Sequence, residues 1–428
     1  MYAIARDEIR QTVRQRASEI VELASELICY PTLSPPGRNT EACQSAVATY
    51  LESAGFETDT FQVFPGDVDV VATRRGSDPE AYSSIIFNGH VDVAEIGERN
   101  SWTRDPFQPV VDGDRLYGRG ACDMKGPLAS VMVAAKVLHD LGVDQRGNLM
   151  VQSVIGEEQG EAGTLTANER GYRADYAIVP EPMEFALSGQ GGVITGWIEI
   201  QSPETLHDGV RAQTIHAGGG LHGASAIEKM SKIITALGEL ERHWALTKQY
   251  PGFPPGTTTI NPAVIEGGRH PAFIADYCGL WITVHFYPNE TWESVTAEIE
   301  DHVLRTAFSD LWLRDNPPTF RWGGRSMIED RGEIFPASAI LADHPATLLL
   351  EEIHREVIGA DPVHRMTTTV TDSGWLESAG IPTVIYGPGS LNQAHTYDEW
   401  ISVEELTRAA EIYALMMAEW CNQRRPET

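Results

Sequence analysis

Short apolar runs that end in turn residues, and then in an acid or a histidine, recur along the chain. Runs of this length, bounded by glycine or proline, are typical of buried β-strands. The four clearest runs cover residues 84–87, 149–155, 177–179 and 382–386. Stretches with apolar residues at helical spacing, such as 6–29 and 128–141, alternate with these runs. Alternating strands and helices predict an α/β domain with a mostly parallel central sheet.

The order of elements changes after residue 190. The expected strands cover residues 192–200, 257–265, 279–287 and 318–322, and the expected helices cover about 224–242 and 290–308. A β-α-β-β-α-β order is typical of a compact α+β unit. We therefore predict an α/β domain in two parts, residues 1–190 and 331–428, with an α+β domain inserted at residues 191–330.

The composition and charge of the chain mainly exclude certain classes of protein. The chain of 428 residues is long enough for two domains. No stretch approaches the roughly 18 to 20 apolar residues of a membrane span, and the N-terminal segment lacks the apolar core of a secretory signal. A formal charge of −29 argues against a nucleic-acid partner, and five scattered cysteines fit a reducing compartment. We expect a soluble cytoplasmic protein.

Candidate chemistry lies where the predicted strands end. His90 and Asp92 stand two residues apart, so both side chains point to the same side of an extended chain. Asp123 follows a glycine-rich segment just before a predicted helix. The carboxyl ends of parallel strands form a crevice in which polar groups converge. Nitrogen and oxygen donors in such a place indicate a borderline divalent metal such as zinc, cobalt or manganese.

Four sequence blocks resemble the family of metal-dependent aminoacylases, acetylornithine deacetylases, succinyl-diaminopimelate desuccinylases and carboxypeptidases. The blocks stand in the family's order and span nearly the whole chain: Gly89-His-Val-Asp92, Gly118-Arg-Gly-Ala-Cys-Asp-Met-Lys-Gly126, Gly156-Glu-Glu158 with Glu181-Pro182, and Gly387-Pro-Gly389 leading to Ala394-His395. The resemblance implies a zinc-peptidase-like catalytic domain. It also implies that the inserted domain is a lid through which two chains form a homodimer.

The resemblance implies a role for each reactive side chain. Asp92 would hydrogen-bond to His90 and fix its tautomer, and Glu157 would be the general base for the attacking water. Two divalent ions, in the first place Zn²⁺, would share five ligands: His90 and Glu181 for the first ion, Glu158 and His395 for the second, and Asp123 as the bridge between them.

The inserted domain supplies a histidine candidate by the same resemblance. His216 keeps the family's spacing to the following helix and would stabilise the oxyanion, within its own chain or across the dimer. His207 and His222 compete with it for this role.

Substrate recognition departs from the family's pattern. His285 stands where a substrate-binding arginine is frequent, and Arg269, Arg321 or Arg325 could take that arginine's place. Gly389, in the last block, is a further candidate for substrate binding. The residue that would bind a substrate carboxylate therefore stays open.

The complete donor set favours a hydrolase. The leading hypothesis is a metal-dependent amidohydrolase that removes an acetyl or succinyl group from the nitrogen of an amino acid, as acetylornithine deacetylase does. A dipeptidase or a glutamate-type carboxypeptidase would use the same metal chemistry, because only the pocket differs. A non-catalytic metal-binding protein on the same fold is the third hypothesis, and such a protein should have lost some of the donors.

Overall fold

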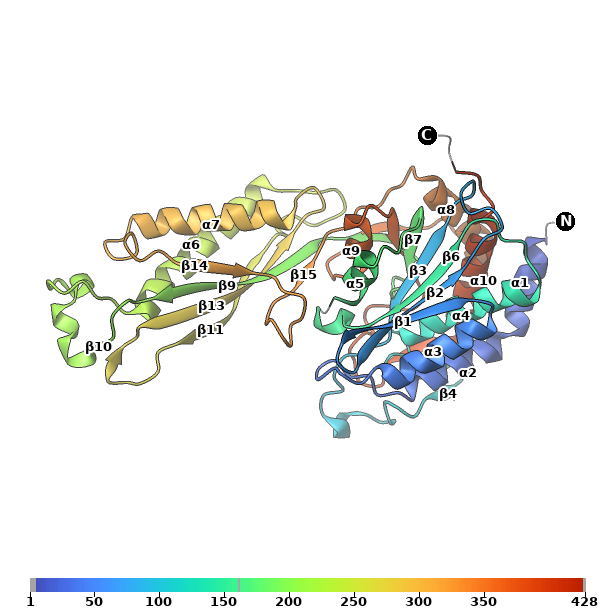
Figure 1. Cartoon of the computed structure of the whole chain (residues 1–428), viewed down its shortest axis with the longest axis horizontal. Coiled ribbons are helices and arrows are strands. Elements are labelled where there is room, and N and C mark those ends of the chain that lie inside the picture. Colours follow the sequence, from blue (N-terminus) through green and yellow to red (C-terminus); the bar gives the residue numbers. More distant parts are fainter. Residues whose placement is uncertain (1–4, 161, 426–428) are drawn as a thin grey trace. The chain divides into compact units, whose positions relative to one another are not determined.

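The computed structural model describes residues 5–160 and 162–425, without the side chain of His216. Contacts between residues divide the chain into two compact units (Figure 1). Unit 1 comprises Met1–Gly189, Ser338–Met366 and Thr371–Thr428, and unit 2 comprises Gln190–Ala337 and Thr367–Val370. The second boundary thus lies after residue 337, where the sequence led us to expect 330.

Unit 1 is built on an eight-stranded sheet with the order β1-β2-β6-β3-β7-β17-β8-β16 (Figure 1). Its strands are β1 (Glu57–Phe64), β2 (Asp67–Arg74), β3 (Ile85–His90), β6 (Leu149–Val154), β7 (Tyr176–Val179), β8 (Leu187–Gln190), β16 (His364–Thr367) and β17 (Thr383–Ile385). The α/β class is confirmed, but the sheet is mixed. The central strands β6, β3, β7 and β17 are parallel, whereas β2 is antiparallel to β1 and β6, and β8 is antiparallel to β17. The short turn at Pro65-Gly66 joins β1 to β2, and a turn of this length can join only antiparallel strands.

Alternate residues of the central strands face two helical layers. Ile85 and Phe87 of β3 belong to the larger apolar core, whereas Ile86 between them packs with Leu376 in a smaller one. Burial on both faces explains why these strands read as continuous apolar runs. The larger core is covered by α1 (Arg6–Gln15), α2 (Ala17–Ile28), α3 (Glu41–Ser53), α4 (Lys125–Asp140), α8 (Pro345–Ile358) and α10 (Val403–Trp420), and the other face by α5 (Gly163–Glu169) and α9 (Ser373–Ser378).

Unit 2 is an antiparallel sheet with two helices packed on it (Figure 1). Along the chain its main elements are β9 (Gly192–Gln201), α6 (Ala226–Thr247), β11 (Ile260–Gly267), β13 (Tyr277–Phe286), α7 (Trp292–Phe308) and β14 (Thr319–Trp322). In the sheet the order is β11-β13-β9-β14, and β15 (Ile334–Phe335) also pairs with β9. Trp244 and Trp312 are fully buried in the core between helices and sheet.

Shorter elements complete the two units. In unit 1, β18 (Trp400–Ser402), β5 (Arg115–Tyr117) and β4 (Val110–Asp112) form a small sheet, and in unit 2 β10 (Leu206–His207) pairs with β12 (Phe273–Ile274). Short 3-10 helices cover Arg99–Ser101, Glu157–Gln159, Asp208–Gln213 and Ile215–Ala217. Among the described residues, no helix combines the length and apolarity needed to cross a membrane.

A buried ion pair joins the segment after α7 to α6 in unit 2. The carboxylate of Asp310 is 3% exposed and accepts hydrogen bonds from Lys229 Nζ at 2.9 Å on each oxygen. Its Oδ1 also accepts from the backbone N–H groups of Trp312 and Leu313, and Lys232 pairs with Oδ2. Burial raises the pKa of Asp310, but these donors together lower it below its usual range.

Replacing this acid should destabilise unit 2. Asp310→Asn leaves the charge of Lys229 buried without its partner, which should cost about 3 kcal/mol at pH 7 and speed hydrogen exchange in α6 and α7. Because the folded pKa is the lower one, this contribution is present above about pH 4 and is lost as the pH falls below it. The difference in unfolding temperature between wild type and variant should therefore narrow in acid.

The matched control is Asp301→Asn, which removes an exposed pair with Arg305 on α7. It should change exchange little, because exposed pairs contribute less than about 1 kcal/mol. If α6 and α7 of Asp310→Asn exchange hydrogen as slowly as in the wild type at pH 7, the ion pair of Asp310 and Lys229 does not stabilise unit 2.

Candidate metal centre

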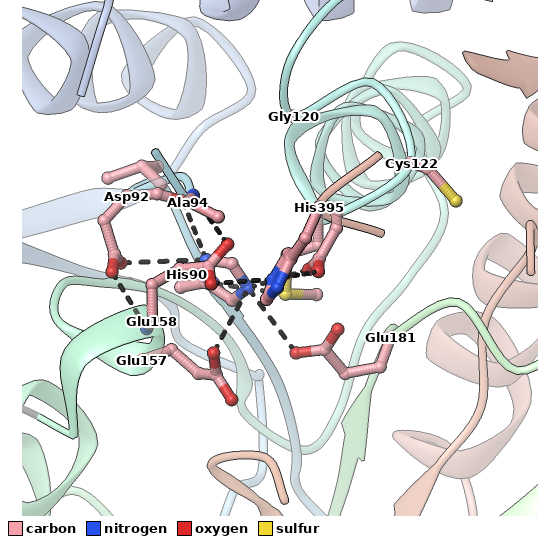
Figure 2. A network of polar contacts seen from close by, with 12 residues as sticks. His90, Asp92, Ala94, Gly120, Cys122, Glu157, Glu158, Glu181 and His395 are labelled. Atoms are coloured by element: carbon pink, nitrogen blue, oxygen red, sulfur yellow. Dashed lines mark hydrogen bonds and ion pairs between the residues drawn. The ribbon is translucent and has the colours of Figure 1, made fainter. Parts of the chain in front are cut away.

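Three neighbouring parallel strands end at the same edge of the sheet in unit 1. His90 ends β3 in register with Val154, the last residue of β6, and β7 lies on the other side of β3. The chain then turns directly into the acids that follow β6 and β7. Figure 2 shows His90, Glu158 and Glu181 from these strand ends close to His395 from a loop. Asp123, from another loop, lies within reach of both histidines.

The five side chains form two half-sites that share Asp123. In the first half-site, His90 Nε2 lies 3.2 Å from Asp123 Oδ1 and 3.6 Å from Glu181 Oε1. In the second half-site, His395 Nε2 lies 2.8 Å from Glu158 Oε2 and 3.4 Å from Asp123 Oδ2. Each oxygen of Asp123 therefore faces a different histidine. This is the arrangement expected of a carboxylate that bridges two ions.

The proton positions of His90 follow from its partners. Its Nδ1 lies 2.9 Å from the backbone carbonyl oxygen of Asp92, which can only accept, so Nδ1 carries a proton. Its Nε2 faces oxygens of Asp123 and Glu181, which are acceptors as well. Only a second proton or a cation at Nε2 makes all of these contacts favourable.

The half-sites have a strongly negative potential. Burial raises the pKa of Glu181 well above its usual range, and Asp123 raises it further. Burial lowers the pKa of His90, but the acids around it raise that pKa more, to well above the usual value. Hydrogen bonds to Asp123 and Glu158 raise the pKa of His395 to about 10. The field that favours protonated histidines also favours metal cations at the same place.

The residues present fit a pair of divalent ions. Glu181 Oε1 is buried and has no hydrogen-bond partner among the described residues, so an ion beside His90 would supply the missing contact. Within each half-site, one donor atom per residue lies within 4.8 Å of the others. Three nitrogen and oxygen donors per ion leave a coordination position for water, as in catalytic zinc sites.

Glu157 lies beside the first half-site. Its Oε2 is 3.9 Å from His90 Nε2 (Figure 2). Burial raises the pKa of Glu157 well above its usual range, and His90 offsets only part of this shift. A raised pKa makes this carboxylate a stronger base than an ordinary glutamate, which favours general base catalysis.

The carboxylate of Asp92 has a different partner from the one expected. The imidazole of His90 donates to the Asp92 backbone, and the carboxylate oxygen Oδ1 lies 3.7 Å from Nδ1, beyond hydrogen-bond distance. The two carboxylate oxygens accept from the backbone N–H groups of Gly156 at 2.8 Å and Glu158 at 3.1 Å. Asp92 therefore anchors the turn that carries Glu157 and Glu158, a role that sequence reasoning did not reveal.

Glu399 is a buried acid that sequence reasoning missed. Its Oε1 accepts from the backbone N–H groups of Gly120, Cys122 and Asp123 at 2.8 to 3.1 Å, and its Oε2 accepts from Arg119 at 2.7 Å. Burial raises the pKa of Glu399 to about 7, against the effect of Arg119. Glu399 holds the loop of Asp123 in place. The sequence did not indicate this role, because the groups that Glu399 binds lie some 280 residues earlier in the chain.

Asp372 was missed as well. It is 3% exposed, is bonded to the side chain of Thr164, and keeps one oxygen without a partner in the described chain. Burial raises its pKa to about 7, and the charge of His90 lowers it, so Asp372 lies within the field of the first half-site. It follows no apolar run, which explains why the strand-end pattern did not indicate it.

The remaining candidates are distributed over both units. In unit 1, Gly389 has φ of 81°, and a Cβ there would lie 2.6 Å from Cys122 Sγ, so packing requires glycine. In unit 2, Arg269 binds Asp276 at 3.1 Å, and His285 is half-buried on β13, where burial lowers its pKa. The side chain of His216 lies outside the described residues. The roles of these four residues stay predictions.

Comparison with known proteins agrees with the blocks found in the sequence. A model of "Peptidase family M20/M25/M40" matches residues 86–419. The N-formyl-4-amino-5-aminomethyl-2-methylpyrimidine deformylases of Bacillus subtilis (strain 168) and Halalkalibacterium halodurans are 54% and 50% identical over 419 residues, which cover 98% of this chain and of each relative. The acetylornithine deacetylase of Proteus mirabilis is 27% identical over 411 residues, or 94% of this chain and 96% of that one.

Solved structures share the fold. The M20 family metallo-carboxypeptidase Sso-CP2 from Sulfolobus solfataricus aligns with a TM-score of 0.72 at 16% identity, over 94% of this chain and 99% of that one. The Bacillus subtilis YXEP protein, described as a dinuclear metal binding peptidase from the same family, aligns with a TM-score of 0.65 at 16% identity, over 95% and 98%. At such identities the likeness establishes the architecture alone.

The anchoring role of Asp92 can be separated from the expected tautomer role. Asp92→Ala leaves the Gly156 and Glu158 N–H groups without acceptors, which should cost about 1 to 3 kcal/mol and speed their hydrogen exchange about 10- to 100-fold. The bond from His90 to the backbone carbonyl should persist, so the Nδ1-protonated tautomer seen by ¹⁵N NMR should stay the same. A changed tautomer with unchanged exchange would contradict the anchoring role.

Proposed function

The chain belongs to peptidase family M20/M25/M40, and from this membership we propose that it hydrolyses the formyl amide of N-formyl-4-amino-5-aminomethyl-2-methylpyrimidine. The products would be formate and the free aminomethylpyrimidine. The observation that carries the proposal is the 54% identity to a deformylase along nearly the full length of both chains. Relatives at this level act on amide bonds, and the chain is a hydrolase of the same class.

The substrate proposal differs from the acyl amino acid expected from the sequence. N-Acetylornithine and N-succinyl amino acids carry a carboxylate, which calls for a cation in the binding site. The formylated pyrimidine has no carboxylate. By resemblance His285 stands at the place of the substrate-binding arginine, and burial lowers its pKa, which favours the neutral imidazole over a cation. A neutral residue at that place supports a neutral substrate.

The metal ions are part of the proposal. We expect two Zn²⁺ ions, held by His90 and Glu181 on one side, by Glu158 and His395 on the other, and by Asp123 between them. Cobalt and manganese accept the same donors. When bound, the ions would lower the pKa of a water molecule and polarise the formyl carbonyl group.

Glu157 would move the proton in this reaction. Its carboxylate lies at the edge of the first half-site, so it is placed to take a proton from the attacking water. It would then give the proton to the departing amine, which must leave protonated at neutral pH. Asp92 supports this step because it anchors the turn on which Glu157 stands.

A homodimer through unit 2 and a cytoplasmic location stay predictions. Support for the dimer comes from β11, an edge strand whose residues after Ile260 are all exposed, with Val264 at 44% and Ile265 at 53%. An exposed edge strand with apolar side chains is a surface on which a second chain can pair.

The decisive test is a substrate panel with the zinc-loaded full chain. We expect formate release from the formylaminopyrimidine, with kcat/KM at least about 100-fold above the values for N-acetylornithine, an N-succinyl amino acid and a dipeptide. Removal of metal with a strong chelator should abolish the activity, and added Zn²⁺ should restore it.

Glu157→Gln is the matched control variant. It should keep the metal content of the wild type but lose about 100- to 10,000-fold in kcat. A preference for N-acetylornithine would overturn the substrate proposal, and full activity after metal removal would overturn the metal-dependent mechanism.

A further inference from the structure

His395 is the most exposed donor of the candidate metal centre. Its side chain is 57% exposed, against 3% for Glu158 in the same half-site and 1% for His90 in the other. Its backbone has φ of 60°, in the left-handed region that residues with a side chain seldom adopt. A residue in such a conformation needs contacts from its surroundings to hold it.

A segment of unit 1 that starts next to the second half-site supplies such contacts. We call residues 94–106 the clasp segment. Its first residue, Ala94, donates its backbone N–H to Glu158 Oε1 at 2.8 Å (Figure 2). The other oxygen of Glu158 faces His395. One end of the clasp segment is therefore attached to a donor of the second half-site.

The other end of the clasp segment is bonded to the loop of His395. Asp398 Oδ1 accepts from the backbone N–H groups of Thr103 and Arg104 at 2.9 and 3.2 Å, and its Oδ2 accepts from Thr103 Oγ1 at 2.7 Å. The hydroxyl of Tyr397 accepts from the backbone N–H of Glu98 at 3.2 Å. Asp398 thus makes three hydrogen bonds only three residues after His395.

The middle of the clasp segment is held by the protein beneath it. Trp102 is buried, donates from Nε1 to the Ile96 carbonyl oxygen at 2.8 Å, and packs edge-on against Tyr397. The guanidinium of Arg119 lies 5.1 Å from the centre of the Trp102 ring and donates to the Glu95 carbonyl oxygen. Because its middle is held in this way, a displacement of one end of the clasp segment would also shift the other end.

These contacts close a ring around the second half-site. The ring runs from Glu158 through Ala94 and the clasp segment to Thr103, and through Asp398 back to His395, which faces Glu158 again. We propose that Asp398 is a positioning residue that holds His395 through Thr103 and thereby sets the affinity of the second half-site for its ion. The inference rests on the two-ion centre of the proposed function and assigns a residue outside the ligand set to one half-site.

Stepwise zinc titration of the metal-free full chain against a chromophoric chelator tests this inference. Asp398→Ala should raise the Kd of the ion in the second half-site about 10- to 100-fold. This is the range found when groups that orient metal ligands are removed. The Kd of the ion in the first half-site should stay within about twofold, because no contact joins His90 or Glu181 to Asp398 or Thr103 among the described residues. Thr103→Val keeps both backbone donors but loses the hydroxyl, so it should raise the second Kd about 2- to 10-fold.

Asp105→Ala is the matched control within the clasp segment. Asp105 accepts from the backbone N–H of Phe107 at 2.9 Å and pairs with Arg99. Neither bond reaches the loop of His395. This variant should bind both ions as the wild type does. Thr103→Val also keeps the test valid if Asp398→Ala fails to fold.

Three results would overturn the inference. Unchanged second-ion Kd values in Asp398→Ala and Thr103→Val would show that the ring does not position His395. Equal losses of affinity at both half-sites would show general loosening of the structure. A wild-type chain that binds fewer than two ions would overturn the two-ion centre and the inference together, whereas the first two results leave that centre intact.

Discussion

The structure depends on the compensation of negative charge at one edge of a sheet. Glu157, Glu158, Glu181 and Asp123 converge on two imidazoles, and of these groups only His395 is largely exposed to water. Carboxylates that are brought this close together and removed from water strongly favour protonation or the binding of cations. The raised pKa values of Glu157 and Glu181 express this constraint. Two divalent ions would satisfy it and would also supply the chemistry of amide hydrolysis.

Further buried acids bind the backbone instead of facing the cluster. Asp92 accepts from the turn of Glu157 and Glu158, and Glu399 accepts from the loop of Asp123. Asp92 uses both carboxylate oxygens on backbone N–H groups, and Glu399 uses one oxygen on three such groups and the other on Arg119. These bonds satisfy buried N–H groups of two irregular segments. The position of the candidate reacting groups thus rests on acids that lie outside the proposed ligand set.

The gathering of three donors could be predicted from the sequence, because strand ends are recognisable and neighbouring parallel strands end at the same edge, whereas the assignment of all five ligands came from the family resemblance. His90, Glu158 and Glu181 each follow an apolar run, and the edge of the sheet brings them together. The roles of Asp92 and Glu399 could not be predicted, since they depend on which atom accepts a bond and on partners far away in the chain. The sequence predicted the parallel centre of the sheet but not the antiparallel strands β2 and β8 beside it. The acyl group of the substrate could not be predicted, because it depends on the side chains of the binding pocket and not on the metal ligands.

The central claim is that two metal ions lie on either side of Asp123, and anomalous X-ray diffraction from crystals of the zinc-loaded protein at the zinc absorption edge tests it most directly. The account predicts two anomalous peaks about 3.5 to 4 Å apart, one beside His90 and Glu181 and one beside Glu158 and His395. A single peak, or peaks away from these five side chains, would contradict it.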